Sequence, residues 1–232
     1  MGILDIIYPR ACPICDEPVP VGEGRICKDC RKKIIYIEEP TCRKCGRHIM
    51  DENEIFCEQC EKTKHIYDEG RALYDYSSMA KSIYRYKYLN RRDYGKFYGE
   101  DISRKLGEII NAWKADAIIP IPLHKKRKRE RGFNQAEIIA KEMGKQLSIP
   151  VITNYCYREK NTEPLKKMDV IARQNNLKNA FNIHGNDVKL KRVILVDDIY
   201  TTGSTIDAVA KLLKEHGVGE VYYIALSIGE GM

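Results

Sequence analysis

The chain has 232 residues, of which 43% are hydrophobic, and carries 40 Lys and Arg against 33 Asp and Glu, a formal net charge of +7. This length allows one large domain or two unequal ones with a real hydrophobic core. No run approaches the roughly 18 apolar residues of a membrane helix, and the opening MGILDIIYPR is too short and too acidic for a signal peptide, so we expect a cytoplasmic protein without membrane insertion. The positive charge favours anionic partners without identifying them.

Cysteine divides the chain into two parts, because eight of the nine cysteines precede residue 61. They form four Cys-x-x-Cys pairs, and a shift of 30 residues places the first two pairs on the second two, so one small unit is used twice. Two such turns supply the four thiolates of a tetrahedral zinc site. The eight residues are Cys12, Cys15, Cys27, Cys30, Cys42, Cys45, Cys57 and Cys60.

Two structural zinc ions explain these cysteines best. Each unit is too small to bury a core, so the metal must supply folding free energy, and four cysteines leave no open position for catalysis. A disulfide framework is disfavoured in a cytoplasmic chain, and redox dithiols seldom occur in four copies. We expect sequential pairing, with the first four cysteines on one ion and the last four on the other; cross-braced pairing stays open. His48 and His65 lie nearby, and we interpret both as surface residues.

The remaining chain is predicted to form a second domain at 67–232, after a zinc-binding module at 1–66. Residues 61–76 are polar and strand-like, and helical spacing predicts two helices within 77–113, broken near Asn90. The alternation of strands and helices after them predicts an α/β fold with a mostly parallel sheet covered by helices on both faces. The further predicted elements are strand 117–123, helix 134–147, strand 150–155, strand 192–197, helix 205–217 and strand 220–228.

The stretch RVILVDDIYTTGST, residues 192–205, contains the main candidate site, since ligands of parallel sheets bind at the carboxyl ends of the strands. Asp197 and Asp198 suit the vicinal hydroxyls of a ribose, or its Mg2+ by way of water. The helix that follows favours a phosphate at its N-terminus. A purely structural alternative is a strand, a turn that contains the Asp residues and a helix with a Thr N-cap. It explains each of these residues singly, but it does not explain their order along the chain. The residues expected to bind the phosphate are Thr201, Thr202, Gly203, Ser204 and Thr205.

Three stretches carry a family resemblance. VILVDDIYTTGST resembles the phosphoribosyl pyrophosphate (PRPP) signature of type I phosphoribosyltransferases, and IIPIPLHKKRKRERGFNQAEIIAKEM looks like the second block of the ComF family within that superfamily. The resemblance continues through NTEPLKKMDVIARQNNLKNAF and includes the cysteine-rich start, so it covers nearly the whole chain. Leu165 is a departure, because the family pattern leads us to expect a Gln there.

The resemblance implies a reaction and a set of roles. PRPP binds with Mg2+, pyrophosphate leaves C1 of the ribose through an oxocarbenium-like transition state, and a nitrogen nucleophile adds. It implies that the Asp197–Asp198 pair holds the ribose hydroxyls and metal and that residues 201–205 hold the 5′-phosphate. His124, Lys125 and Arg131 would face the pyrophosphate from the turn after PIPL. Residues 158–173 would form the flexible loop that covers the site.

The acceptor is not identified by the sequence. Relatives that act on 6-oxopurines carry an Asp at the position of Thr201, where it manages a proton on the base. A threonine cannot do this, which argues against hypoxanthine-guanine salvage.

Two features suggest nucleic acid as a further partner. Six of the seven residues 125–131 are cationic, more than one pyrophosphate needs, although a solvated basic loop is an equal alternative. Tyr84, Tyr86 and Tyr88 alternate with Arg85 and Lys87, a mixture that suits base stacking together with binding of phosphates. Tyrosines facing the core explain the same pattern and are slightly favoured. Cys156 is expected to be a buried strand residue.

Two functions of different class follow. One is an enzyme that transfers phosphoribosyl to an unidentified nitrogenous acceptor. The other is a non-catalytic, PRPP-responsive factor that binds single-stranded DNA, because the resemblance links such proteins to DNA uptake in natural transformation and to DNA-uptake proteins as partners.

Overall fold

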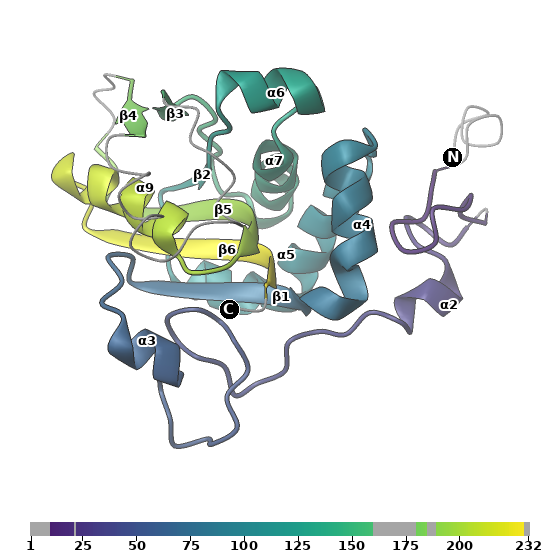
Figure 1. Ribbon diagram of the computed structural model, residues 1–232, viewed down its shortest axis with the longest axis horizontal. Coiled ribbons are helices and arrows are strands. Elements are labelled where there is room, and N and C mark those ends of the chain that lie inside the picture. Colours follow the sequence, from purple (N-terminus) through teal and green to yellow (C-terminus); the bar gives the residue numbers. More distant parts are fainter. Residues whose placement is uncertain (1–9, 21, 160–179, 185–188, 230–232) are drawn as a thin grey trace.

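The computed structural model describes residues 10–20, 22–159, 180–184 and 189–229, and its centre is a four-stranded sheet (Figure 1). All neighbouring strands of this sheet pair in parallel, so their carboxyl ends meet at one edge. The α/β class predicted from the alternation of elements is confirmed. In spatial order the strands are β1 (Glu69–Asp75), β6 (Glu220–Ile228), β5 (Arg192–Tyr200) and β2 (Ala117–Pro120).

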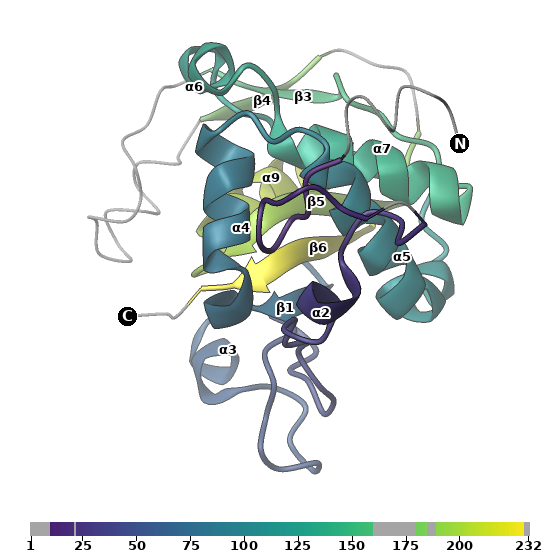
Figure 2. The same ribbon diagram turned by 90° about the vertical axis from the view of Figure 1, so that its right-hand side faces the viewer.

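Helices cover both faces of the sheet (Figure 2). Alternate residues of β5 point to the two faces: Ile194 and Val196 pack with α4, α5 and α7, whereas Val193 and Leu195 pack with α9. The continuous apolar run of this strand is therefore explained by two separate cores. The helices are α4 (Tyr76–Tyr88), α5 (Tyr94–Ala112), α7 (Gln135–Leu147) and α9 (Ser204–Glu215).

The predicted break near Asn90 is confirmed, since α4 ends at Tyr88 and Asn90 has a φ of 53°. The strand predicted at 150–155 is wrong. Only Val151 pairs there, in a single bridge with Ile118, because the polar residues that follow it make a turn. The chain then enters β3 (Cys156–Arg158), which pairs antiparallel with β4 (Phe181–Ile183) and buries Cys156 as predicted.

The cysteine-rich segment forms two small units on different flanks of the sheet, and Figure 1 shows them well apart. The first zinc unit, residues 12–30, lies beside α4 and α5 and contains the start of α2 (Lys28–Arg31). The second zinc unit, residues 42–60, lies below β1 and contains the start of α3 (Glu58–Lys62). Each short helix begins directly after a cysteine, so the metal ligand and the helix start are set by the same turn.

Both edges of the sheet are partly covered. Residues 31–41, here called the linker, connect the two zinc units and run along β1. Ile37 N donates to Leu73 O at 3.0 Å, and Asp75 N donates to Ile35 O at 3.0 Å. At the other edge, Ile118 N of β2 donates to Pro150 O at 2.8 Å. These bonds pair backbone groups that an edge strand otherwise leaves open.

Candidate functional site

The candidate site lies where β5 ends and α9 begins. Asp197 and Asp198 occupy half-buried positions near the carboxyl end of β5, and Asp198 N donates to Asp197 Oδ1 at 2.8 Å. Burial of its carboxyl, with the charge of Asp198, raises the pKa of Asp197 to about 7, against the opposing effect of that backbone bond and of Lys87. Two adjacent carboxylates so placed favour a cation or hydroxyl donors as ligands.

Lys87 of α4 was not predicted as a site residue, yet it contacts the acidic pair. Its Nζ lies 2.9 Å from Asp198 Oδ1, and both side chains are largely buried. The sequence had suggested Lys87 as a partner for nucleic acid phosphates, because its neighbours are tyrosines. In the structure Tyr86 is buried in the core, and the next residue, Lys87, points toward β5. Lys87 and Asp198 are far apart along the chain, so only the fold reveals that they meet.

Residues 201–205, here called the phosphate loop, turn the chain from β5 into α9. Gly203 has a φ of 73° and is the N-cap residue of α9, and the hydroxyls of Thr202 and Ser204 lie 2.8 Å apart. Thr201 is exposed, and Thr202 and Thr205 are half-buried. The first N–H groups of a helix have no acceptor within it, so this turn can offer them and its hydroxyls to an anion.

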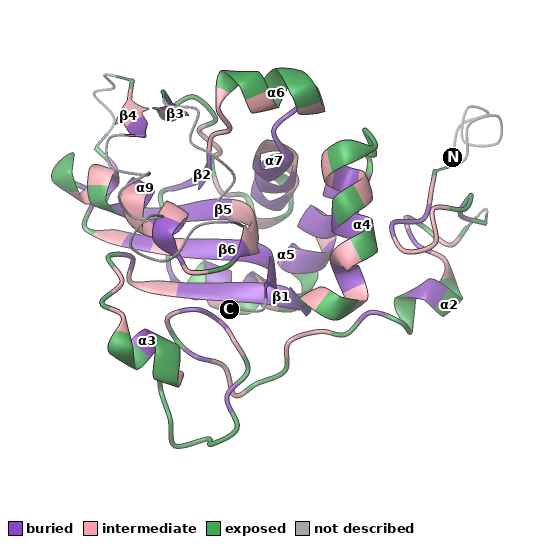
Figure 3. Cartoon of the chain, viewed as in Figure 1, coloured by how far each residue is buried: buried purple, intermediate pink, exposed green. Residues whose placement is uncertain are grey.

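The basic run after β2 is a helix and not the predicted turn or loop. It forms α6 (Lys125–Arg131), with His124 as its N-cap residue accepting from Lys126 N at 3.2 Å. No residue of α6 is buried, as the green and pink colours of Figure 3 show. Lys125, with Lys128, Arg129 and Gly132, lines a hollow of about 410 Å³. The short helix ends at Gly132, whose φ of 76° stops it in the left-handed region.

Arg131, the third residue predicted to contact pyrophosphate, is held by neighbouring helices. It donates from Nη1 to Gln135 Oε1 at 3.0 Å, and its guanidinium lies 5.1 Å from the ring centre of Tyr88. His124 and Lys125 lie at the start of α6, and Figure 1 shows this helix above β2. Most of the predicted covering loop 158–173, including Leu165, lies outside the described residues.

The tyrosines of α4 divide between core and surface. Tyr86 is buried and donates to Gln135 O at 2.8 Å, which confirms the core-facing interpretation for this residue. Tyr84 and Tyr88 are 58% and 56% exposed, and their ring centres lie 5.1 Å apart. They are one turn apart on the helix, so they form an exposed aromatic pair beside α6.

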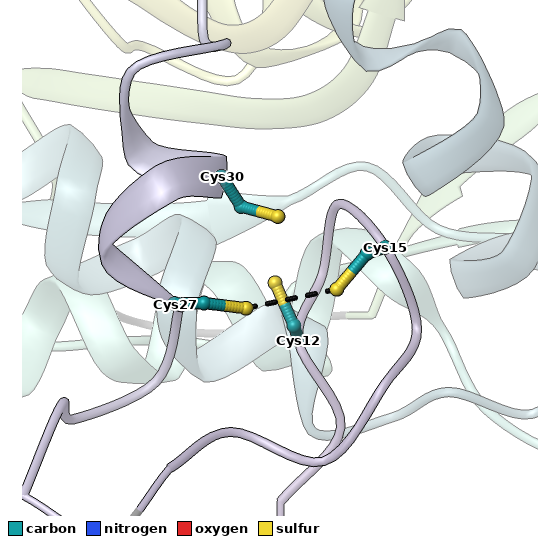
Figure 4. A group of neighbouring side chains, drawn as sticks. All are labelled: Cys12, Cys15, Cys27 and Cys30. Atoms are coloured by element: carbon teal, nitrogen blue, oxygen red, sulfur yellow. Dashed lines mark hydrogen bonds between the residues drawn. The ribbon is translucent and has the colours of Figure 1, made fainter.

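The eight cysteines of the zinc units gather into two groups in sequence order, which matches the sequential pairing. Within each group the four sulfurs lie within 4.8 Å of one another. Figure 4 shows the four cysteine side chains of the first unit pointing toward one another. Cys15 Sγ lies 3.6 Å from Cys27 Sγ in this unit, and Cys45 Sγ lies 3.6 Å from Cys57 Sγ in the second. Tetrahedral zinc with Zn–S bonds of about 2.3 Å requires sulfurs about 3.8 Å apart, so both groups fit the ion.

His65 corrects the prediction that both nearby histidines lie at the surface. His48 is exposed and contacts Glu38 O through Nδ1 at 2.9 Å. The His65 side chain is only 2% exposed, and its Nδ1 lies 2.8 Å from Asp207 Oδ2 of α9. A single sequence gives no sign of this partner, because Asp207 is 142 residues away.

Comparison with known proteins agrees with this architecture. The double zinc ribbon domain family matches residues 3–61, and the phosphoribosyl transferase domain family matches residues 98–227. Among curated relatives, Competence protein F of Haemophilus influenzae is 41% identical over 46% of this chain and 47% of that protein. Competence protein ComFC of Bacillus subtilis is 32% identical over 64% of this chain and 59% of that protein. DNA utilization protein YhgH of Escherichia coli K12 is 32% identical over 46% of each chain.

The chain spans about half the length of the curated relatives it matches. Among solved structures, the purine phosphoribosyltransferase of Pyrococcus horikoshii covers 57% of this chain and 74% of its own, with a TM-score of 0.36 and 22% identity. No helix in the described part of the chain is long and apolar enough to span a membrane. Since one family matches more than half of the chain and the other matches the segment with the eight paired cysteines, the chain belongs to the phosphoribosyl transferase domain family and carries a double zinc ribbon before that domain.

Proposed function

We propose that this chain binds PRPP with Mg2+ and transfers its phosphoribosyl group to a nitrogenous acceptor. The observation that carries the proposal is the succession of Asp197, Asp198 and the phosphate loop at one strand end, in a chain of this family. A carboxylate pair for the ribose diol and a helix N-terminus for its 5′-phosphate lie next to each other along the chain. This order matches the two ends of a ribose 5-phosphate.

Each part of the site has a proposed role. Asp197 and Asp198 hold the ribose hydroxyls and would hold Mg2+ through water, and the ion would supply positive charge to the oxygens of pyrophosphate. The phosphate loop fixes the 5′-phosphate, and His124, Lys125 and Arg131 of the α6 region meet the pyrophosphate. To these we add Lys87, which balances the charge of Asp198.

The proposed reaction is a substitution at C1 of the ribose. The C1–O bond to pyrophosphate breaks, its electron pair leaves with the pyrophosphate, and the acceptor nitrogen forms the new C1–N bond and loses its proton. The chain contributes by holding both reactants and by neutralising the leaving group. Thr201 cannot take up a proton from a base, so the proton of the acceptor passes to solvent water or to the departing pyrophosphate.

The test is binding and turnover of PRPP. Calorimetry with PRPP and Mg2+ should show binding to the wild type and its loss in Asp197→Asn/Asp198→Asn, while circular dichroism shows a retained fold. Asp93→Asn is the control, because Asp93 is exposed at the start of α5 and caps nothing with its side chain. Pyrophosphate release against a panel of bases and oligonucleotides then identifies the acceptor. Unchanged PRPP affinity in the folded double variant would refute the site.

The alternative function, a PRPP-responsive factor that binds single-stranded DNA, is favoured by one surface. The exposed pair Tyr84 and Tyr88 contacts α6, because Arg131 of that helix lies over the ring of Tyr88. The same helix carries the basic hollow described above. Aromatic faces next to cations suit bases and phosphates of a single strand. The similar proteins named for competence and DNA utilization support the same choice.

Fluorescence anisotropy with a labelled oligonucleotide at several salt concentrations tests this alternative. Lys128→Gln/Arg129→Gln should flatten the salt dependence, with the slope reduced by about 0.7 for each phosphate that the protein no longer neutralises. Tyr88→Ala should lower the affinity by about 1–3 kcal/mol with the slope nearly unchanged. Lys211→Gln, on exposed α9 surface, is the matched control. Absence of salt-sensitive binding by the wild type would leave the enzyme as the only function.

A further inference from the structure

His65 joins the second zinc unit to the helix that starts at the phosphate loop. It lies in the short segment between α3 and β1, and its Nδ1 is 2.8 Å from Asp207 Oδ2. The backbone adds a second bond, from Ile66 N to Asp207 Oδ1 at 2.7 Å. Both oxygens of this carboxylate are therefore engaged by the segment that follows the second zinc unit.

Asp207 is a critical position for an anion site, because it lies in the first turn of α9. A free carboxylate there would be attracted to the helix N-terminus and would repel an incoming phosphate. His65 and Ile66 N hold the Asp207 carboxylate on the side of the helix that faces the segment after the second zinc unit. They leave the N–H groups of the phosphate loop to a ligand.

The same histidine supports the loop from below. Its Nε2 lies 3.3 Å from Tyr200 Oη, and a side chain added at Gly203 would place its Cβ 2.8 Å from Tyr200 Oη and 2.9 Å from His65 Cε1. The backbone of the phosphate loop thus rests directly on the pair of His65 and Tyr200.

A continuous set of contacts leads from this pair to the second zinc unit. Tyr200 stacks on Tyr223 with ring centres 5.2 Å apart, and Tyr223 Oη donates to the backbone oxygen of Cys45, a predicted zinc ligand, at 2.7 Å. Tyr67 completes the set, since its ring stacks on His65 at 4.8 Å and its hydroxyl lies 2.9 Å from Tyr200 Oη. The three tyrosines are buried in the same core as the cysteines of the second zinc unit.

We propose that His65 and Asp207 are positioning residues for the phosphate loop, and that the second zinc unit, unlike the first, is part of the support of that loop. The described hydrogen bonds of the first unit run instead to α4, to α5 and to Arg91 in the turn between these helices. The ligand of this loop is the 5′-phosphate of a ribose phosphate. This identification of the ligand rests on the proposed function. The shape of the loop itself does not depend on that function.

The first test separates the two ends of the ligand. His65→Leu should weaken binding of ribose 5-phosphate about tenfold, as expected when a charged hydrogen bond is removed, and leave binding of pyrophosphate with Mg2+ unchanged. His65→Asn, whose amide can still donate to Asp207, should recover most of the affinity. His48→Leu is the control, because His48 lies within the second zinc unit but is exposed and contacts Glu38 O instead of Asp207. An equal loss for both ligands indicates general damage to the fold and refutes the positioning role.

The second test needs no ligand. Hydrogen exchange of residues 201–207 should speed up in Cys45→Ser, which disrupts the second zinc unit, and in the milder Asp207→Asn. It should not change in Cys15→Ser, which disrupts the first. Equal exchange in Cys45→Ser and Cys15→Ser would overturn the proposal. If the wild type binds neither PRPP nor ribose 5-phosphate, the proposed function fails, and this exchange pattern still decides for or against the support by the second zinc unit.

Discussion

The two zinc units have the same cysteine spacing but attach to opposite faces of the sheet. Buried cysteines of the first unit share a core with α4, α5 and α7, and those of the second share a core with α9. The first unit also makes polar contacts through side chains, in which Arg85 Nη1 donates to Ile14 O and Arg25 Nε pairs with Glu100. The second is held by backbone packing on β1 and by buried tyrosines.

One repeated position shows how this difference arises. Asp16 and Gly46 are 30 residues apart and have similar backbone φ values of 69° and 70°. The Asp16 carboxylate accepts hydrogen bonds from Arg91 and Tyr94, so here a side chain makes the attachment. At Gly46 a Cβ would lie 2.7 Å from Ala72 N of β1, so here the backbone itself makes the contact. Each residue directly follows a Cys-x-x-Cys pair, and its N–H donates to the backbone oxygen of the first cysteine of that pair. This shared turn sets the conformation, and the residue type at this position determines which neighbour is contacted.

The largest expected effect is loss of a zinc ligand. Cys42→Ser should lower the metal content from two ions to one and strongly destabilise the phosphoribosyl transferase domain, because Cys42 is fully buried in the α9 core and structural zinc supplies about 10–16 kcal/mol. Cys12→Ser should also lose one ion, but should unfold the α4–α5 side first. Metal analysis and thermal unfolding measure both effects. Loss of two ions from either substitution would contradict two independent units.

A smaller effect is expected at the repeated position. Gly46→Ala should cost roughly 2–3 kcal/mol, because it adds strain at positive φ to a collision with the backbone of β1. Asp16→Gly keeps the conformation and removes the bonds to Arg91 and Tyr94 together with a longer ion pair to Arg85, so about 1–2 kcal/mol is expected. Denaturant unfolding of the zinc-loaded chain gives the two values. If Asp16→Gly proves the more harmful, the contrast between backbone and side-chain attachment is wrong.

The smallest effect concerns an ion pair of the first unit. Arg25 Nε lies 2.7 Å from Glu100 Oε1, with both side chains partly exposed. Arg25→Gln should therefore change the free energy of unfolding by less than about 1 kcal/mol, and less still at high salt. A double-mutant cycle with Glu100→Gln at two salt concentrations measures the coupling. A coupling above about 2 kcal/mol would show that this pair holds the first unit more firmly than its exposure suggests.

Local patterns in the sequence were sufficient for the grouping of the cysteines into two sets of four, the break near Asn90 and the parallel sheet. Each depends on residues close in the chain or on a regular period, such as Cys-x-x-Cys or the apolar run of β5. The strand predicted at 150–155 failed because an apolar start at Val151 does not show where the pairing stops. The roles of Lys87 and His65 could not be predicted, because their partners Asp198 and Asp207 are brought near only by the fold.

The linker along β1 has a consequence for aggregation. Its bonds to Leu73 and Asp75 occupy backbone groups on the outer edge of the sheet. The linker is anchored at both ends by a zinc unit, so a chain stripped of metal would release it and expose this edge. An open strand edge recruits other chains by intermolecular β-pairing. Metal loss should therefore lead to self-association through β1 before the central strands unfold.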